Sequence, residues 1–298
     1  MLSNVLNVQY GIQGSIEFKE GGAGFSFVHI KNANGEAVIS LYGGQVTHLQ
    51  LKDDEPILWV SPLSEFTPGK AIRGGIPICW PWFGPHSSDP LLPQHGIARI
   101  SNWSVVNTCL LEGDQVRVIL RCDQDRIDQL AKWEGVELEL SITLGKTLRL
   151  DLCTRNRKRE AIVVGGALHT YFRVEDIHQI AVQGLESTHY RDKLDQYKRK
   201  FQEGGVVFTG ETDREYLDTK SDCILIDKAK SRSLKVSKEG SNTTVLWNPW
   251  QVRSEEMADF SDNGFKQMVC IEAAITANDE QIIAPGENHI LSQTITLL

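Results

Sequence analysis

Apolar and polar residues alternate along much of this chain. Residues 115–121, 136–144 and 147–154 follow a period of two over most of their length. This alternation is typical of β-strands whose side chains face the core and the solvent in turn. Gly145 and Lys146 separate the last two segments, which predicts a hairpin.

Other short segments, rich in β-branched and aromatic residues, predict further strands. They are residues 25–30, 37–42, 45–51, 162–172, 179–182, 223–226, 234–237, 244–247, 268–274 and 293–297. Helical periodicity is confined to residues 123–133, with Ile127, Leu130 and Trp133 on one face, and to 254–260, where Ser254 is the expected N-cap. Many strands and few helices predict an all-β fold, an antiparallel β-sandwich or barrel-like double sheet. No repeat or linker marks a boundary, so we expect residues 1–298 to form one domain.

Composition and charge narrow the possible partners. The chain has 298 residues, 41% of them hydrophobic and 23% charged, with 31 Lys and Arg against 39 Asp and Glu. A net charge of −8 argues against nucleic-acid binding, which needs a broad basic surface. No segment approaches the roughly 20 apolar residues that span a bilayer, so we expect no membrane partner. The N-terminus lacks a positive patch followed by an apolar run, and we therefore expect a cytoplasmic protein.

The six cysteines give no sign of a metal or redox site. They are Cys79, Cys109, Cys122, Cys153, Cys223 and Cys270. No two of them form the CxxC pair of zinc or dithiol sites. We expect six free thiols, most of them buried as small hydrophobic side chains.

Two long stretches lack a regular pattern. Residues 70–99 are rich in Gly and Pro and contain Trp80, Trp82 and Phe83, and residues 184–215 are polar and charged. Long irregular segments in a compact domain are usually functional or disordered. The three aromatic residues favour an ordered binding loop for 70–99.

His169 and Glu272 are the candidate acid and base. His169 follows the small residues Gly165 and Gly166, which leave room for a ligand or another strand. An imidazole there could donate a proton near neutral pH, although a core histidine with satisfied hydrogen bonds fits the same pattern. Glu272 lies in an apolar strand segment, where burial would raise its pKa and make it a better base. An edge-strand or ion-paired glutamate is the alternative.

The loop 70–99 also gathers candidate binding residues. Arg73, Gln94, His95 and Arg99 would together suit a polyhydroxylated anion, since the guanidinium fork matches phosphate geometry. Trp80 and Trp82 offer flat apolar faces for a sugar ring. The alternative is an exposed arginine on a loop that is packed by tryptophans.

Several motifs resemble one known family. Residues 73–84, RGGIPICWPWFG, resemble the signature loop of the hexose-6-phosphate mutarotases, a branch of the aldose 1-epimerase superfamily. Further motifs agree in type and order, so the resemblance covers nearly the whole chain. They lie at residues 94–99, 167–172, 213–214, 247–250 and 266–272.

The resemblance implies an antiparallel β-supersandwich of the galactose mutarotase type, with the active site on its concave face. It implies that His169 protonates the ring oxygen and that Glu272 takes the proton of the C1 hydroxyl. Arg73, Gln94, Arg99 and Asp213 would bind substrate, with the arginines placed for the phosphate.

The implied activity is that of an isomerase which interconverts the α and β anomers of a hexose 6-phosphate, foremost glucose 6-phosphate. This chemistry requires no metal and no cofactor. We expect a monomer whose partner is the sugar phosphate. Two alternatives stay open, a non-catalytic sugar-phosphate sensor on the same fold and a mutarotase of unphosphorylated aldoses.

Overall fold

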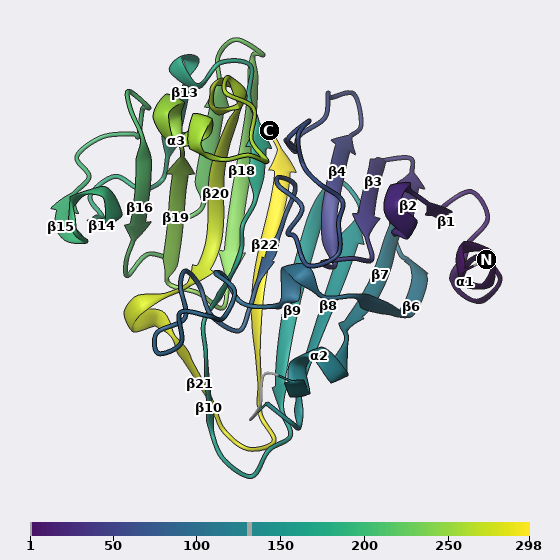
Figure 1. The fold of residues 1–298 in the computed structure, drawn as a ribbon. Helices are drawn as coiled ribbons and strands as arrows, with labels where there is room; N and C mark the ends of the chain where they lie inside the picture. The colour runs from purple at the N-terminus through teal and green to yellow at the C-terminus, as the bar shows by residue number, and fades with distance from the viewer. Residues whose placement is uncertain (1, 130–132) are drawn as a thin grey trace.

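The computed structural model describes residues 2–129 and 133–298, and antiparallel strands dominate it (Figure 1). This confirms the predicted all-β fold. The strands form three larger sheets and one short two-stranded sheet.

The first of the two eight-stranded sheets contains the strands with the clearest alternation. Its order is β13 (Ile180–Gln183), β17 (Cys223–Asp227), β18 (Arg232–Glu239), β22 (Asn288–Leu297), β9 (Thr147–Asn156), β8 (Val136–Leu144), β7 (Gln115–Cys122) and β6 (Trp103–Leu111). The hairpin of β8 and β9 is confirmed, with Leu144 opposite Leu148. Leu138, Leu140 and Ile142 point inward and are fully buried, as a period of two requires.

A second sheet carries the chain segments that build the pocket described below. Its order is β15 (Lys198–Phe201), β14 (His189–Asp192), β16 (Thr212–Tyr216), β19 (Thr243–Asn248), β20 (Met268–Ile275), β11 (Gly166–Leu168) and β5 (Ile78–Cys79), and β12 (Tyr171–Arg173) also pairs with β20. Every residue of β20 is buried, because one face of this strand packs on the core and other segments cover its second face. Gly166 permits the close approach of β5, since a Cβ there would lie 2.6 Å from the Cys79 carbonyl oxygen.

The third sheet comes from the N-terminal part of the chain. It runs in the order β1 (Ile16–Glu20), β2 (Ser26–Asn32), β3 (Gly35–Ser40) and β4 (Gln45–Leu51), and the short sheet pairs β10 (Ile162–Val164) with β21 (Gln281–Ile283). Strand β20 contacts β18 and β22, whereas β2 contacts β7 and β3 contacts β8. The second and third sheets therefore lie side by side over the first, and the main hydrophobic core fills the space between the two layers (Figure 1).

Helices are short and peripheral in the described residues. They are α1 (Leu2–Tyr10), α2 (Gln124–Gln129), α3 (Trp250–Glu256) and the 3₁₀ turns η1 (Gly22–Gly24), η2 (Ala98–Ile100), η3 (Ile177–Gln179), η4 (Lys193–Asp195), η5 (Gly264–Gln267) and η6 (Ala277–Asp279). We did not predict α1, none of whose residues is buried. None of the helices in the described part of the chain has the length and apolar character to cross a membrane.

The two predicted helices need correction at their ends. The first begins at Gln124 and is described as far as Gln129, and residues 130–132, including Leu130, lie outside the described residues. Ser254 is not the N-cap of the second. That helix begins directly after Pro249, and Ser254 lies in its last turns, where the hydroxyl donates to the Trp250 carbonyl. Proline fits a helix start, because the first turn needs no donor there.

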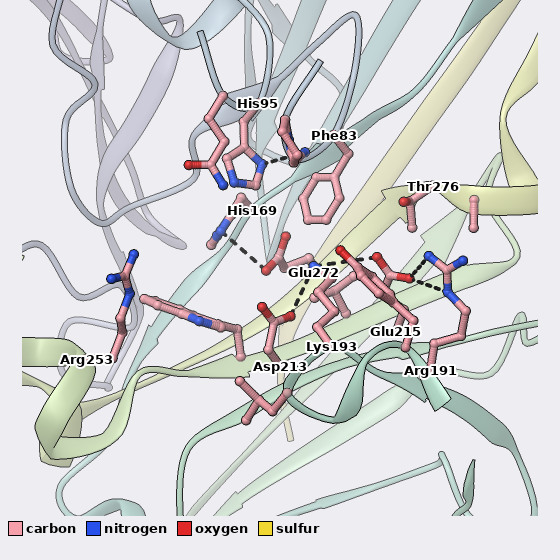
Figure 2. Close-up of a pocket in the computed structure, with 18 of the residues that line it drawn as sticks. Phe83, His95, His169, Arg191, Lys193, Asp213, Glu215, Arg253, Glu272 and Thr276 are labelled. Atoms are coloured by element: carbon pink, nitrogen blue, oxygen red, sulfur yellow. Dashed lines mark hydrogen bonds and ion pairs between the residues drawn. The ribbon is translucent and has the colours of Figure 1, made fainter. Parts of the chain in front are cut away.

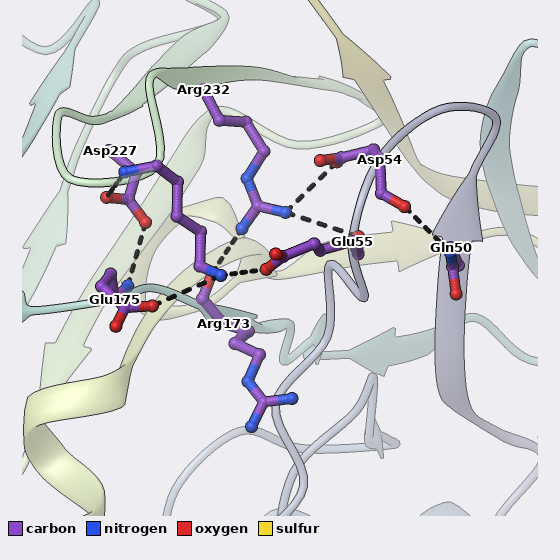
Figure 3. A network of polar contacts seen from close by, with 8 residues as sticks. Gln50, Asp54, Glu55, Arg173, Glu175, Asp227 and Arg232 are labelled. Carbon is purple, nitrogen blue, oxygen red and sulfur yellow. Dashed lines mark hydrogen bonds and ion pairs between the residues drawn. The ribbon is translucent and has the colours of Figure 1, made fainter.

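A buried arginine on β18 ties three distant segments together (Figure 3). The side chain of Arg232 is 4% exposed, and it donates to Asp54 Oδ2 at 3.2 Å and to the Arg173 carbonyl at 2.8 Å. The segment after β4 is thereby held against β12. The next residues of that segment run alongside β12, where the Trp59 amide donates to the Tyr171 carbonyl. This network fixes the backbone of Tyr171, which lines the pocket.

Candidate active site

The second sheet carries a pocket of about 630 Å³ on the face turned away from the core (Figure 2). Its walls come from the loop 70–99, the turn between β11 and β12, strands β14, β16, β19 and β20, and helix α3. The main lining residues are Arg73, Phe83, Gln94, His95, Arg99, His169, Tyr171, Arg191, Lys193, Tyr197, Glu211, Asp213, Glu215, Val245, Trp247, Arg253, Met257, Glu272 and Glu280.

Strand register brings distant residues into rows on this face. Arg191 is opposite Glu215, Glu215 is opposite Val245, and Val245 is opposite Glu272. Directly opposed residues of antiparallel strands point to the same face, so these four side chains form one line across the sheet. The adjacent line consists of Asp213, Trp247, Cys270 and Tyr171.

His169 and Glu272 lie together in this pocket. The His169 amide donates to the Pro77 carbonyl at 3.1 Å, which anchors the turn between β11 and β12. The imidazole stacks on the Tyr171 ring with centroids 4.9 Å apart, and its Nε2 lies 3.4 Å from Glu272 Oε1. The structure therefore brings the candidate acid and the candidate base together in one pocket.

Both members of the pair are almost fully buried at the base of the pocket. The exposed fraction is 8% for His169 and 1% for Glu272. Burial raises the pKa of Glu272 well above its ordinary value of 4.5, against the opposing charge of Lys193. Burial, with a smaller contribution from Arg99, lowers the pKa of His169 well below 6.5. Each shift disfavours the charged form, as desolvation does.

Unpartnered polar atoms mark the centre of the pocket. Both carboxylate oxygens of Glu272 and Nδ1 of His169 have no hydrogen-bond partner among residues 2–129 and 133–298. Buried polar atoms are nearly always paired, and those that are not call for an explanation. The two residues that carry these atoms line a cavity large enough for a small polar molecule.

Two glycines place Arg73 at the pocket wall. Gly74 and Gly75 have φ values of +115° and +64°, and a Cβ at either would lie under 2.5 Å from a carbonyl oxygen of a neighbouring strand or segment. Arg73 Nε donates to Asp259 Oδ2 at 3.0 Å, and its Nη1 donates to the Tyr171 hydroxyl at 3.2 Å. The Arg73 charge is therefore already compensated.

Arg99 differs from the other cationic residues of the pocket. Arg73, Arg191, Lys193 and Arg253 each form an ion pair with a carboxylate. In the described part of the chain, Arg99 has no such pair, and its Nη2 donates to the Gln94 carbonyl at 2.7 Å. The remaining guanidinium donors are free to bind an anion.

His95 is fixed as a neutral hydrogen-bond donor. Its Nδ1 accepts from the Gly84 amide at 3.2 Å, so the proton of the neutral ring is on Nε2. Burial and, after it, the Arg99 charge lower the pKa of His95 well below 6.5. Phe83 packs edge-on against the imidazole at 4.8 Å. His95 can thus donate from Nε2 to a molecule in the pocket.

The predicted tryptophan platform is wrong. Trp80 is 2% exposed, and its indole nitrogen donates to Thr154 Oγ1 at 2.9 Å, in the layer below the pocket. Trp82 donates to the Pro93 carbonyl and packs against His86. Neither residue lines the pocket. The aromatic walls are Phe83, Tyr171, Tyr197 and Trp247. A one-dimensional pattern cannot say which tryptophan of a folded loop faces inward.

Several pocket residues escaped the sequence analysis. Arg191, Lys193 and Glu215 come from the stretch 184–215, which folds as β14, β15 and β16 rather than as a structureless segment. The alternating charges of Asp213, Arg214 and Glu215 were the available signal for a strand here. A strand that buries charged residues, however, lacks the alternation of apolar and polar residues by which strands are predicted. Tyr171 and Trp247 lay in predicted strands, and only the register shows which face they occupy.

One cluster has the donor atoms of a metal site. Ligand atoms of His169, Cys270 and Glu272 lie within 4.8 Å of one another. Nitrogen, sulfur and carboxylate oxygen are acceptable donors to zinc. An ion held there would engage the same imidazole and carboxylate that form the centre of the pocket.

The six cysteines are all free, and Cys109 alone is not buried.

Comparison with known proteins agrees with this geometry. The aldose 1-epimerase family profile matches residues 26–296. A protein of Cenchrus ciliaris with the provisional name glucose-6-phosphate 1-epimerase is 39% identical over 267 residues, which cover 84% of this chain and 78% of that protein. A protein of Escherichia coli K12 with the same provisional name is 32% identical over 263 residues, 87% of this chain and 86% of that protein.

Solved structures show the same architecture. A crystal structure from Salmonella typhimurium, provisionally described as a mutarotase, superposes with a TM-score of 0.88 at 27% identity and covers 97% of this chain and 95% of its own. An aldose 1-epimerase candidate from Escherichia coli K12, at 13% identity, has a TM-score of 0.69 and covers 92% of this chain and 99% of its own. The galactose mutarotase-like fold expected from the sequence is confirmed.

Proposed function

The chain belongs to the aldose 1-epimerase family and is an isomerase, and on this basis we propose that it interconverts the α and β anomers of a hexose 6-phosphate, foremost glucose 6-phosphate. The observation that carries the proposal is the buried pair of His169 and Glu272, 3.4 Å apart in a pocket with a free guanidinium. The provisional names of its relatives point to the same substrate.

The pair suits the chemistry of anomer exchange. The C1 hydroxyl and the ring oxygen are bonded to the same carbon, so the groups that exchange protons with them must lie close together. Glu272 takes the hydroxyl proton while protonated His169 gives a proton to the ring oxygen, and the C1–O5 bond breaks. The aldehyde turns about C1–C2, and ring closure from its other face returns both protons with the roles reversed.

A reversible reaction needs two groups of similar proton affinity. The ordinary pKa values of the imidazole and the carboxyl are 6.5 and 4.5, and burial lowers the first and raises the second. Burial lowers the proton affinity of the imidazole, which makes imidazolium a stronger acid, and raises that of the carboxyl, which makes the carboxylate a stronger base. General acid–base groups of this kind contribute roughly 10²–10⁴-fold in rate.

Arg99 is the residue we propose for the phosphate. Its charge is not balanced by a carboxylate within the described ranges, whereas that of Arg73 is. A guanidinium binds phosphate through paired, charge-assisted hydrogen bonds. Gln94, His95, Arg73 and Asp213 would contact sugar hydroxyls or the phosphate from the same walls. An anchored C6 would hold the sugar while C1 turns, so remote binding energy serves orientation.

Anomer exchange measured by NMR saturation transfer tests the proposal. The enzyme is assayed on glucose 6-phosphate, with glucose and galactose alongside. We expect a higher kcat/KM for the phosphorylated sugar than for either free sugar. Equal or better rates on the free sugars would identify a mutarotase of unphosphorylated aldoses. Binding of glucose 6-phosphate by calorimetry without any rate enhancement would identify a sensor.

We also propose that the protein acts in the cytoplasm as a monomer with the sugar phosphate as its ligand. Six free thiols favour a reducing compartment, in which sugar phosphates are made and used. Light scattering at assay concentration tests the oligomeric state. A mass that is a multiple of the chain mass would contradict the monomer.

A further inference from the structure

Lys193 occupies a central place among the charges of the pocket. It belongs to η4, between β14 and β15, and its side chain is 17% exposed. Its Nζ lies 3.1 Å from Asp213 Oδ1, 3.5 Å from Glu215 Oε1 and 4.8 Å from the centroid of the Phe83 ring (Figure 2). An ammonium with three neighbours and little water has a fixed position.

We propose that Lys193 is a positioning residue for anomer exchange, which holds Asp213 at the pocket wall and supplies the positive charge beside Glu272. This inference rests on the function proposed above and extends it to a residue that neither the sequence motifs nor the comparisons single out. Lys193 would be the cation whose charge allows several carboxylates to lie close together in one buried site.

Crowding of carboxylates makes such a cation necessary. Glu272 lies on the same face of the sheet as Asp213 and Glu215, which are both on β16, two strands away from β20. Like charges in one desolvated site disfavour each other's ionised form. Arg191 neutralises Glu215 through its Nε at 2.8 Å, which leaves Lys193 as the partner of Asp213. Without Lys193, the Asp213 carboxylate would face Glu272 uncompensated.

Other titratable groups also face Glu272, and they bound the size of the effect. They are His169 from the turn between β11 and β12, His95 and Arg73 from the loop 70–99, Arg99 from η2, Cys79 from β5, Tyr171 from β12, and Cys270 on the same strand. Strand β19 contributes Val245 and Trp247, which carry no charge. Of the charges that act on Glu272, Lys193 lowers its pKa most. Lys193 itself is stabilised as an ammonium, since Asp213 and Glu215 raise its pKa against the effect of burial.

The test compares three variants. Lys193→Met keeps the length of the stem and removes the charge, and Lys193→Arg restores the charge. Lys200→Met is the matched control, because Lys200 is on β15 of the same hairpin, pairs with Asp192 and Asp195, and does not line the pocket. Melting temperature is followed for each, so that a loss of fold is recognised.

The pH profile of kcat/KM is the first measurement. The pKa that sets the acid limb of this profile should be about one pH unit or more higher in Lys193→Met than in the wild type. At pH values below the limb, kcat/KM should therefore be about tenfold lower in the variant. Activity should recover at higher pH, KM should rise because Asp213 is no longer held, and Lys193→Arg should restore the limb. A profile that is unchanged, or lowered equally at all pH values, would overturn the proposal.

Direct titration of Glu272 separates this proposal from the proposed function. The carboxyl carbon is followed by ¹³C NMR in the resting enzyme and identified by its absence from Glu272→Gln. Its pKa should be higher in Lys193→Met than in the wild type and unchanged in Lys200→Met. Equal pKa values in all three proteins would refute the role of Lys193, even if the wild type catalyses anomer exchange. A raised pKa in an enzyme inactive on every sugar would instead refute the proposed function.

Discussion

The imidazole of His169 lies flat on the phenol ring of Tyr171, with their centroids 4.9 Å apart and their planes 12° from parallel. The Tyr171 hydroxyl in turn accepts from Arg73, which pairs with Asp259. This stack fixes the plane in which Nε2 of His169 meets the carboxylate of Glu272. The acid–base pair is thus oriented by residues that need not touch the reacting atoms.

Substituting either member of the pair should slow catalysis strongly without unfolding the protein. We expect His169→Gln and Glu272→Gln each to reduce kcat for glucose 6-phosphate by about 10²–10⁴-fold, the range of general acid–base catalysis. Saturation-transfer NMR measures the rate, and circular dichroism verifies the fold. A variant with wild-type exchange would remove the residue from the proposed mechanism.

Glu272→Gln should also make the protein more stable at neutral pH. Burial raises the pKa of Glu272 above 4.5, so the folded state binds this proton more tightly than the unfolded state. The stability that it contributes is present below pH 4.5 and is lost as the pH rises through the folded pKa. Removing the ionisable group should add about 1–3 kcal/mol to the free energy of unfolding at pH 7. Urea unfolding at pH 7 and pH 4 measures this, and a gain of equal size at both would contradict it.

Arg99 and Arg73 should respond differently to substitution. Arg99→Met removes the uncompensated guanidinium, so KM for glucose 6-phosphate should rise about tenfold or more, with little change for glucose. Arg73→Met leaves Asp259 and Tyr171 without a partner, and we expect lower kcat on both sugars and a lower melting temperature. Steady-state kinetics on the two substrates distinguishes these patterns. The same rise in KM for glucose as for its phosphate in Arg99→Met would argue against phosphate anchoring.

Substitutions of Trp80 and Trp247 should also have different effects, the first on stability and the second on substrate binding. Trp80→Phe removes a buried indole bonded to Thr154, and we expect the free energy of unfolding to fall by about 1–3 kcal/mol while KM stays unchanged. Trp247→Phe alters a pocket wall and should raise KM. Thermal unfolding and kinetics of both variants provide the measurement. An increased KM in Trp80→Phe would show that Trp80 contributes to sugar binding and would contradict this prediction.

Local sequence predicted what depends on neighbours along the chain. The alternation in 136–144 and 147–154 predicted two strands and their hairpin, because a side-chain period of two is a property of a single strand. It failed for β14 to β16, where charged residues are half-buried against one another and the apolar signal is lost. It also misplaced the start of α3, because Ser254 satisfies a helix carbonyl instead of an N-terminal amide.

The sequence by itself determined the all-β fold and supplied His169, Glu272 and the loop arginines as candidates. The tertiary structure alone decided that Glu215, Val245 and Glu272 face one pocket and that Trp80 faces away from it. It also decided that Arg99 has no carboxylate partner among the described residues. The physical reason is that strand register and ion pairing join residues far apart in the chain. His169 and Glu272 are separated by 103 positions, yet antiparallel pairing through β20 brings them within 3.4 Å.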